Sequence, residues 1–247
     1  MRTKVLICAA ALAAASAFTT MAQNVYSLNV VGYININLVE GFNLVANQLD
    51  FDGTGLNNTP ANVLSTNLPL NSEVYGWAND SWNIAHLTQP RGASTPSWSV
   101  VSGSMPSMNP GQGVWLSIPS GGLSGTSSNV TVVGQVDQGA GLAVNTNLAA
   151  AGGFSLLSSI VPVAGGLTTV MNYAAAINDE VYQWNPGTPS GSWTINHWTQ
   201  PRGASTPSWS LVSGPTGSPA EPTIAVGQGF WLSSSPSSVW SNYFIVQ

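Results

Sequence analysis

The chain contains an internal duplication, which constrains its fold more than any other feature of the sequence. The twelve residues 88–99 (TQPRGASTPSWS) recur unchanged as residues 199–210. Shorter matches keep the same order, at offsets between 107 and 116 residues. The sequence therefore predicts two similar units of about 110 residues, each large enough for one domain or half of one. The other matched segments are 41–44 with 153–156, 73–77 with 180–184, 81–87 with 192–198, and 111–117 with 227–233.

Both units have the sequence pattern of strands and turns. The matched segments are short, rich in β-branched and aromatic residues, and bounded by Gly, Pro, Asn or Ser, which is typical of strands. One short helix is expected in each unit, at residues 60–66, with Thr59 as the cap and Pro60 at the first helical position, and at residues 167–173. The sequence thus predicts an all-β fold of two tandem, sandwich-like repeats. The predicted strands are 25–36, 42–48, 73–77, 81–87, 113–118 and 130–136, their counterparts in the second unit, and 239–246.

The segment between the two units resembles both ends of the chain. Residues 128–136 match residues 241–247 at their start and residues 30–32 in their middle. A strand that closes the first unit and opens the second explains both matches. The predicted domains are then a first repeat over residues 23–127 and a second over residues 128–247.

The first 22 residues have the pattern of a secretory signal peptide. Arg2 and Lys4 precede an apolar stretch, residues 5–18, and Thr20-Met21-Ala22 forms a small-residue cleavage site. The sequence therefore predicts export, to the periplasm, the cell surface or the medium.

The charge of the remaining chain excludes several functions. Residues 23–247 hold two arginines, nine carboxylates, no lysine and no cysteine, a formal charge of −7. Nucleic acid is not an expected partner, because affinity for phosphates requires many cations. Thiolate chemistry and cysteine metal sites are excluded, and no cofactor is expected. No apolar run after residue 22 approaches the roughly 20 residues that span a bilayer.

Three motifs recur in order in both units. Gly-Phe-[Asn/Ser]-Leu opens each unit, Glu-Val-Tyr-x-Trp lies in its middle, and Gly-Gln-Gly-[Val/Phe]-Trp lies near its end. Residues 24–247 therefore resemble a family of secreted bacterial proteins that carry two such repeats after a signal peptide. The resemblance implies export and a β-rich repeated fold, and it implies no particular activity. The segment TQPRGASTPSWS departs from the more acidic and aromatic sequence of that family.

This repeated segment contains the candidate ligand-binding residues. Arg91 and Arg202, each between Pro and Gly, are the only cations after residue 22. An arginine binds carboxylates and stacks on flat rings, and Trp98 and Trp209 are expected to be exposed beside it. The four residues predict a loop that binds a ligand such as a glycan.

A structural role is the alternative for the same segment. In that case each arginine pairs internally with a carboxylate, Glu73 in the first unit and Glu180 in the second. Other tryptophans lie in strands with apolar neighbours and are expected in the core. These are Trp77, Trp115, Trp184 and Trp231.

The sequence contains no catalytic constellation. His86 and His197 are the only histidines, and each follows Trp-x-Ile-x on one face of a predicted strand. Neither has a second histidine at ligand spacing, so a histidine bonded to backbone is expected, with a metal bridging the two imidazoles as the alternative. No Gly-x-Ser-x-Gly elbow is present, and pairs such as Glu73 with Asp80, or Glu180 with Asp179, are candidates by residue type alone.

These observations favour an exported, non-catalytic structural or surface-interaction protein. The predicted strands 25–36 and 239–246 carry no charge, and uncharged strand edges tend to pair with other chains. Other copies of the chain and components of the cell envelope are therefore the expected partners. The alternative is a carbohydrate-binding module that uses Arg91, Trp98, Arg202 and Trp209.

Overall fold

The computed structural model describes residues 30–125, 127–138, 143–147, 153–187, 190–234 and 239–244. The predicted signal peptide lies outside the described residues. Strands and a single four-residue helix form the regular structure of the described chain, so the prediction of an all-β fold is confirmed. The elements of the first half are β1 Val31–Val39, β2 Gly41–Ala46, α2 Pro60–Val63, β3 Glu73–Ala78, β4 Ser81–Thr88, β5 Ser97–Ser102, β6 Gly113–Ile118 and β7 Ser127–Gln135. Those of the second half are β8 Ala143–Asn147, β9 Gly153–Leu157, β10 Gly165–Gly166, β11 Glu180–Asn185, β12 Ser192–Thr199, β13 Ser208–Ser213, β14 Thr223–Ile224, β15 Phe230–Ser234 and β16 Val239–Tyr243.

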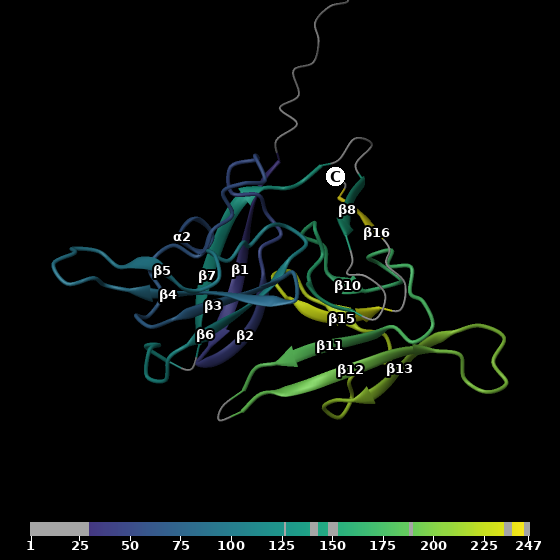
Figure 1. Cartoon of the computed structure of the whole chain (residues 1–247). Coiled ribbons are helices and arrows are strands. Elements are labelled where there is room, and N and C mark those ends of the chain that lie inside the picture. The colour runs from purple at the N-terminus through teal and green to yellow at the C-terminus, as the bar shows by residue number, and fades with distance from the viewer. Residues whose placement is uncertain are drawn as a thin grey trace, which may run out of the picture. The chain divides into compact units, whose positions relative to one another are not determined.

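Two five-stranded antiparallel sheets contain most of these strands (Figure 1). Their strand orders are β2-β6-β3-β4-β5 and β9-β15-β11-β12-β13, which correspond strand for strand along the duplication. Cross-strand pairs correspond as well, since Trp77 faces Trp82 in the first sheet and Trp184 faces Trp193 in the second. The duplication is therefore present at the level of register as well as sequence.

A two-stranded ribbon accompanies each sheet. β7, the segment predicted to close the first unit and open the second, pairs with β1 from Val39↔Ser127 to Val31↔Gln135. The corresponding ribbon of the second half is β8 with β16. By strand pairing, β7 lies with the first half.

The two Gly-Gln-Gly motifs lie where the halves meet. The Ala46 N–H donates to the Gly227 carbonyl oxygen at 2.9 Å, and the Ser158 N–H donates to the Gly111 carbonyl oxygen at 3.0 Å. Gly227 therefore continues the hydrogen bonding of β2, and Gly111 continues that of β9. The two contacts are equivalent, so the halves are related by an approximate two-fold axis.

Glycine is required at the last position of each motif because the backbones approach closely. A Cβ on Gly229 would lie 2.9 Å from the Val45 carbonyl oxygen and 3.2 Å from the Gly113 Cα. A Cβ on Gly113 would lie 2.8 Å from the Leu157 carbonyl oxygen. Real Cβ atoms essentially never lie within 3.0 Å of such neighbours, so these glycines allow the two halves to pack.

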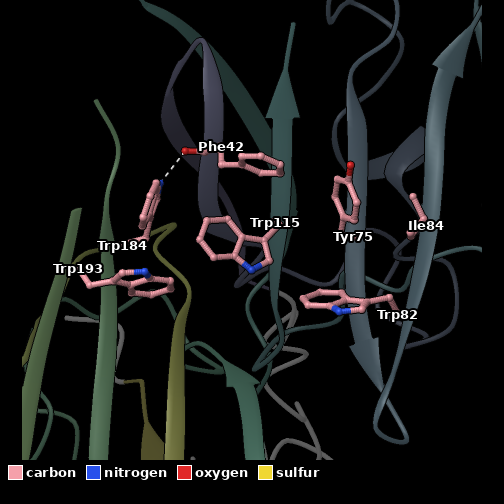
Figure 2. Close-up of a pocket in the computed structure, with 7 residues that line it drawn as sticks. All are labelled: Phe42, Tyr75, Trp82, Ile84, Trp115, Trp184 and Trp193. Atoms are coloured by element: carbon pink, nitrogen blue, oxygen red, sulfur yellow. Dashed lines mark hydrogen bonds between the residues drawn. The ribbon is translucent and has the colours of Figure 1, made fainter. Parts of the chain in front are cut away.

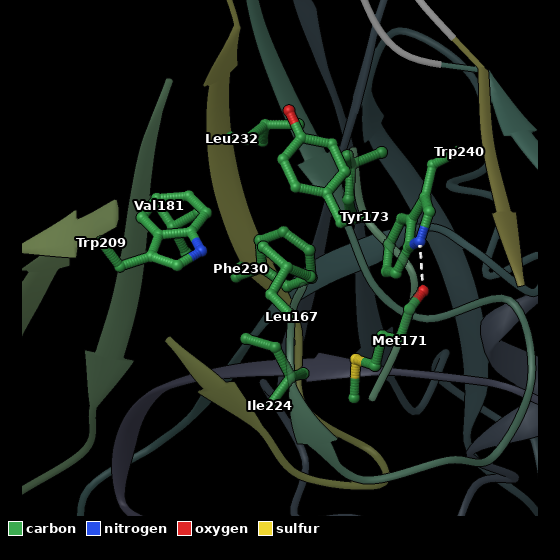
Figure 3. Close-up of a cluster of buried hydrophobic side chains, with 10 residues drawn as sticks. Leu167, Met171, Tyr173, Val181, Trp209, Ile224, Phe230, Leu232 and Trp240 are labelled. Carbon is green, nitrogen blue, oxygen red and sulfur yellow. Dashed lines mark hydrogen bonds between the residues drawn. The ribbon is translucent and has the colours of Figure 1, made fainter. Parts of the chain in front are cut away.

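Each half has its own apolar core on the inner side of its sheet. In the second half, the Trp240 indole N–H donates to the Met171 carbonyl oxygen at 2.7 Å inside the cluster (Figure 3). The buried members of this cluster are Leu157, Leu167, Met171, Tyr173, Val181, Trp209, Ile224, Phe230, Leu232 and Trp240.

The helix prediction is confirmed in the first half only. α2 follows Thr59 and begins at a proline, as expected, but it ends after four residues. Residues 167–171 form a turn in place of the predicted second helix at 167–173. The Val170 N–H bonds to the Gly166 carbonyl at 3.0 Å, and Asn172 then adopts a φ of 57°. That left-handed conformation ends the helical path after one turn.

Candidate functional site

The structure does not bring the four predicted ligand residues together. Trp98 and Trp209 are only 9 % and 7 % exposed. They lie on β5 and β13, two strands that the sequence analysis missed, and Trp98 pairs with the buried Leu87. The expectation of exposed indoles is therefore wrong. The reason is the alternation in Ser-Trp-Ser-[Val/Leu]-Val-Ser, which turns each tryptophan toward the core.

Arg91 and Arg202 are exposed in the hairpin loops that precede β5 and β13. Glu73 and Glu180 accept hydrogen bonds from tyrosine hydroxyls instead, and within the described residues neither arginine has an ion-pair partner. The predicted internal ion pairs are thus not formed. A ligand role for the loop arginines stays a prediction.

A second candidate site lies on the other face of the two sheets. Ten aromatic side chains from matched positions form one continuous array there, which we call the aromatic groove. Neighbouring rings have centroid separations of 4.9–6.4 Å and tilted or edge-to-face geometry, the arrangement that aromatic quadrupoles favour. The members are Phe42, Tyr75, Trp77, Trp82 and Trp115 from the first sheet, and Phe154, Tyr182, Trp184, Trp193 and Trp231 from the second.

The aromatic groove follows the approximate two-fold axis. Trp77 and Trp82 are 4.9 Å apart at 65°, and Trp184 and Trp193 are 5.1 Å apart at 65°. Every ring contact within it has a counterpart whose separation agrees within 0.3 Å. The rings that meet across the two sheets are Trp77 and Trp82 with Trp231, and Trp184 and Trp193 with Trp115.

Two cavities open between these rings. Their volumes are about 430 and about 400 Å³, within the range of roughly 300–1,000 Å³ that small-molecule sites occupy. The first cavity is lined by Phe42, Tyr75, Trp82, Ile84, Trp115, Trp184 and Trp193 (Figure 2). The second is lined by Trp77, Trp82, Phe154, Tyr182, Trp193 and Trp231.

The lining side chains remain accessible to solvent. Phe42, Phe154 and Trp82 are 49 %, 46 % and 37 % exposed. The four tryptophans that were expected in the core are half-buried here, so that expectation is wrong: Trp77, Trp115, Trp184 and Trp231. Figure 2 shows one hydrogen bond among the lining residues. The Trp184 indole N–H of the second half donates to the Phe42 carbonyl oxygen of the first half at 2.7 Å.

Strand alternation explains why these tryptophans lie outside the core. Along β3, Val74 is buried, whereas Glu73, Tyr75 and Trp77 share the opposite face. Both faces carry apolar residues, so hydrophobicity alone does not identify the inner one. Glu73 lies on the same face of β3 as Tyr75 and Trp77. It is the residue that could have identified this face as the outer one, because unpaired carboxylates are rarely buried.

A polar row borders the aromatic groove in each half. Glu73 lies opposite His86 on β4 and opposite Ser117 on β6, about 7 Å along the strands from the row of Tyr75. His86 in turn lies opposite Ser99. The corresponding row of the second half is Ser233, Glu180, His197 and Ser210.

The tyrosine hydroxyls connect the aromatic groove to the polar row. Tyr75 donates to Glu73, and Tyr182 donates to Glu180 at 2.5 Å. Burial, together with the hydrogen bond to the carboxylate, raises the pKa of each tyrosine to about 12. The hydroxyls therefore stay protonated at neutral pH, and each glutamate offers a fixed acceptor beside a cavity.

The acidic pairs considered for hydrolysis do not converge. Glu73 and Asp80 lie at opposite ends of the β3 strand and its turn, about 20 Å apart along the chain. Asp179 is buried on the core side, where its carboxylate accepts from the Tyr173 hydroxyl at 2.6 Å and the Ala176 N–H at 2.7 Å. Each histidine faces its own glutamate within its own sheet, and no cluster of three metal-ligating side chains is found among the described residues.

No helix within the described ranges has the length and apolar character needed to cross a membrane.

Comparison with other proteins assigns no function to this site. Searches of protein-family models, of curated proteins and of solved structures find no match for this chain.

Proposed function

We propose that the protein is an exported, non-catalytic surface-interaction protein that binds a glycan in the aromatic groove. The observation that supports this function is the array of ten half-exposed aromatic rings around two cavities. Export rests on the predicted signal peptide. Components of the cell envelope, which include glycans, are the partners expected from that location.

The chemistry of the groove fits a sugar ring. A pyranose presents one or both faces as a flat patch of C–H groups, and an indole face packs against such a patch. Glycan sites also need a few fixed hydrogen-bonding groups around the apolar floor. Glu73 and His86 in one half, and Glu180 and His197 in the other, supply acceptors and donors at that position.

Charge favours an uncharged glycan. Glu73 and Glu180 border the groove, and a carboxylate-bearing or sulfated chain would be repelled by them. Arg91 lies beyond the end of β4, whereas Trp82 is at its start, a separation of about 20 Å along the strand. The only cations after residue 22 thus lie too far away to offset this repulsion.

Retention on insoluble neutral polysaccharides tests the proposal. We expect the wild type to co-sediment with at least one of cellulose, xylan, mannan or starch, and the Trp82→Ala/Trp193→Ala variant to lose at least about tenfold in affinity. Arg91→Ala/Arg202→Ala is the matched control and should bind as the wild type does. Retention lost in the arginine variant and kept in the tryptophan variant would instead support the loop hypothesis, and no retention on any polysaccharide would refute glycan binding.

Self-association is a second candidate function. β5 and β13 are the outer strands of the two sheets, carry no charge, and expose Val101 and Val212. Within the described chain, the outer edges of β5 and β13 have no backbone partner, which makes them available to other copies. Each of the two strands carries a β-bulge, opposite Ile84 and Ala85 in β5 and opposite Ile195 and Asn196 in β13, which interrupts regular pairing there.

Sedimentation velocity over a wide concentration range tests this candidate. Since each chain carries two such edges, association would form open chains larger than dimers. The Val101→Lys/Val212→Lys variant should then sediment as a monomer. A wild type that remains monomeric at all concentrations would exclude self-association.

A further inference from the structure

The two cavities of the aromatic groove share two lining residues, Trp82 and Trp193. We propose that the cavities are two half-sites of one continuous groove, whose ligand is a neutral β-linked glycan chain long enough to occupy both. This inference rests on the proposed glycan function and specifies the ligand class.

The shared indoles couple the two half-sites. Trp82 contacts Trp77 of its own sheet at 4.9 Å and Trp231 of the other sheet at 5.9 Å. Trp193 makes the equivalent contacts with Trp184 and Trp115, at 5.1 and 5.7 Å. A sugar ring in either half-site therefore packs against indoles that the other half-site also uses.

Linked rings gain most from this arrangement. Once one ring of a chain is bound, the next is held near the second half-site at high effective concentration, so the affinity of the chain exceeds that of a single ring by orders of magnitude. A monosaccharide gains none of this. The ligand class is therefore an oligomer or polymer.

The two-fold relation has a consequence for chain direction. A glycan chain has a reducing and a non-reducing end, whereas matched side chains line the groove from both ends. The glycan can therefore bind in either direction with similar affinity. β-Linked chains with equatorial substituents fit best, because their rings are flat and present C–H patches on both faces.

Cello-oligosaccharides of one to six glucose units, titrated by calorimetry, test the inference. We expect negligible binding of glucose, an affinity that rises at least about 100-fold once the oligomer spans both half-sites, and one oligomer bound per chain. Glucose that binds at two equivalent sites, without a gain for longer oligomers, would overturn the continuous groove and leave glycan binding intact. No binding of cello-oligosaccharides at any length, together with retention on the α-linked starch alone, would overturn the β-linked ligand class and leave the proposed function supported.

A matched pair of variants tests the two-fold relation. Phe42 lines only the first cavity, and Phe154, its counterpart, lines only the second. Phe42→Ala and Phe154→Ala should each weaken cellohexaose binding by about tenfold and leave the far-UV circular dichroism spectrum unchanged. An effect confined to one of the two variants would show that a single cavity binds the ligand.

Discussion

Trp98 and Trp209 occupy the same place in two halves of one chain, in identical twelve-residue segments, yet their indoles are bonded differently. The Trp98 N–H donates to the Ser65 carbonyl oxygen at 2.9 Å. The Trp209 N–H is buried and finds no acceptor among the described residues. Ser65 follows α2, and the second half has turns in place of that helix. The energetics of an identical segment are thus set by the segments that diverged around it.

The inner faces of the two sheets differ in the same way. Gly76 leaves room for Pro106, whose Cβ would be 3.2 Å from an added methyl group. Its counterpart Gln183 fills that space and donates to the Thr223 carbonyl oxygen at 2.8 Å. At this position the first half packs its long loop closely against the sheet, whereas the second half bonds its loop through a buried side chain. Elsewhere the first loop is also bonded, since the buried Asn47 side chain donates to the Met108 carbonyl oxygen at 2.9 Å.

The glycines between the halves give the largest predicted effect, and it should be equal on both sides. Gly113→Ala and Gly229→Ala each place a methyl group below 3.0 Å from a carbonyl oxygen. We expect each to lower the free energy of unfolding by about 3 kcal/mol, measured by urea denaturation. Gly125→Ala, with open space around it, is the control and should have little effect. Clearly unequal losses would show that the two contacts are not equivalent.

Substitution of Asp179 and of its counterpart Ser72 should give the next largest effect, a difference between the halves in the free energy of unfolding. Asp179 accepts hydrogen bonds from the Tyr173 hydroxyl and the Ala176 N–H, and burial together with this bond raises the pKa of Tyr173. Asp179→Ala leaves both donors without this acceptor, for a loss of about 2–3 kcal/mol. The side chain of the equivalent Ser72 makes one hydrogen bond, to the Pro69 carbonyl oxygen, so Ser72→Ala should cost about 1 kcal/mol. Equal losses in urea denaturation would contradict the view that the second half depends more on buried polar groups.

Substitution of Trp98 and Trp209 should give a smaller difference between the halves in the free energy of unfolding. Trp98→Phe loses volume and a hydrogen bond, whereas Trp209→Phe loses similar volume and removes a buried N–H that has no acceptor in the described chain. We expect Trp98→Phe to be more destabilising by about 1 kcal/mol in urea denaturation. A larger loss for Trp209→Phe would indicate that its indole N–H is bonded.

Local patterns in the sequence were sufficient for much of this fold and for little of the site. Alternation and turn residues predicted β3, β4 and the hairpin between them, because those signals are contained within a few neighbouring residues. β5 was missed because proline, serine and glycine dominate the segment that leads into it. The aromatic groove was missed because Trp77 meets Trp231 across two sheets, and no local pattern encodes which rings come together across more than 150 residues.

The smallest predicted effect concerns pH and again distinguishes the halves. Burial alone would raise the pKa of Glu221, but hydrogen bonds from the hydroxyls and N–H groups of Thr168 and Thr169 outweigh it and hold the pKa below its usual value. A lowered pKa in the folded state stabilises the protein above the unfolded value of about 4.3. That contribution is lost as the pH falls through the lower, folded pKa.

We therefore expect Glu221→Gln to reduce the melting temperature slightly at pH 6 and to have less effect near pH 3, where the wild type has lost the same contribution. Asp52 in the first half also has a lowered pKa, because of hydrogen bonds from the Asn57 and Thr54 side chains and the Thr54 N–H. These hydrogen bonds are exposed, so solvent screens them, and Asp52→Asn should change the melting temperature less than Glu221→Gln at pH 6. A Glu221→Gln effect that is the same at both pH values would mean that the bonded carboxylate does not stabilise the turn at residues 167–171. The side-chain hydrogen bonds that hold the loop before β14 would then come from Gln183 and Asn196.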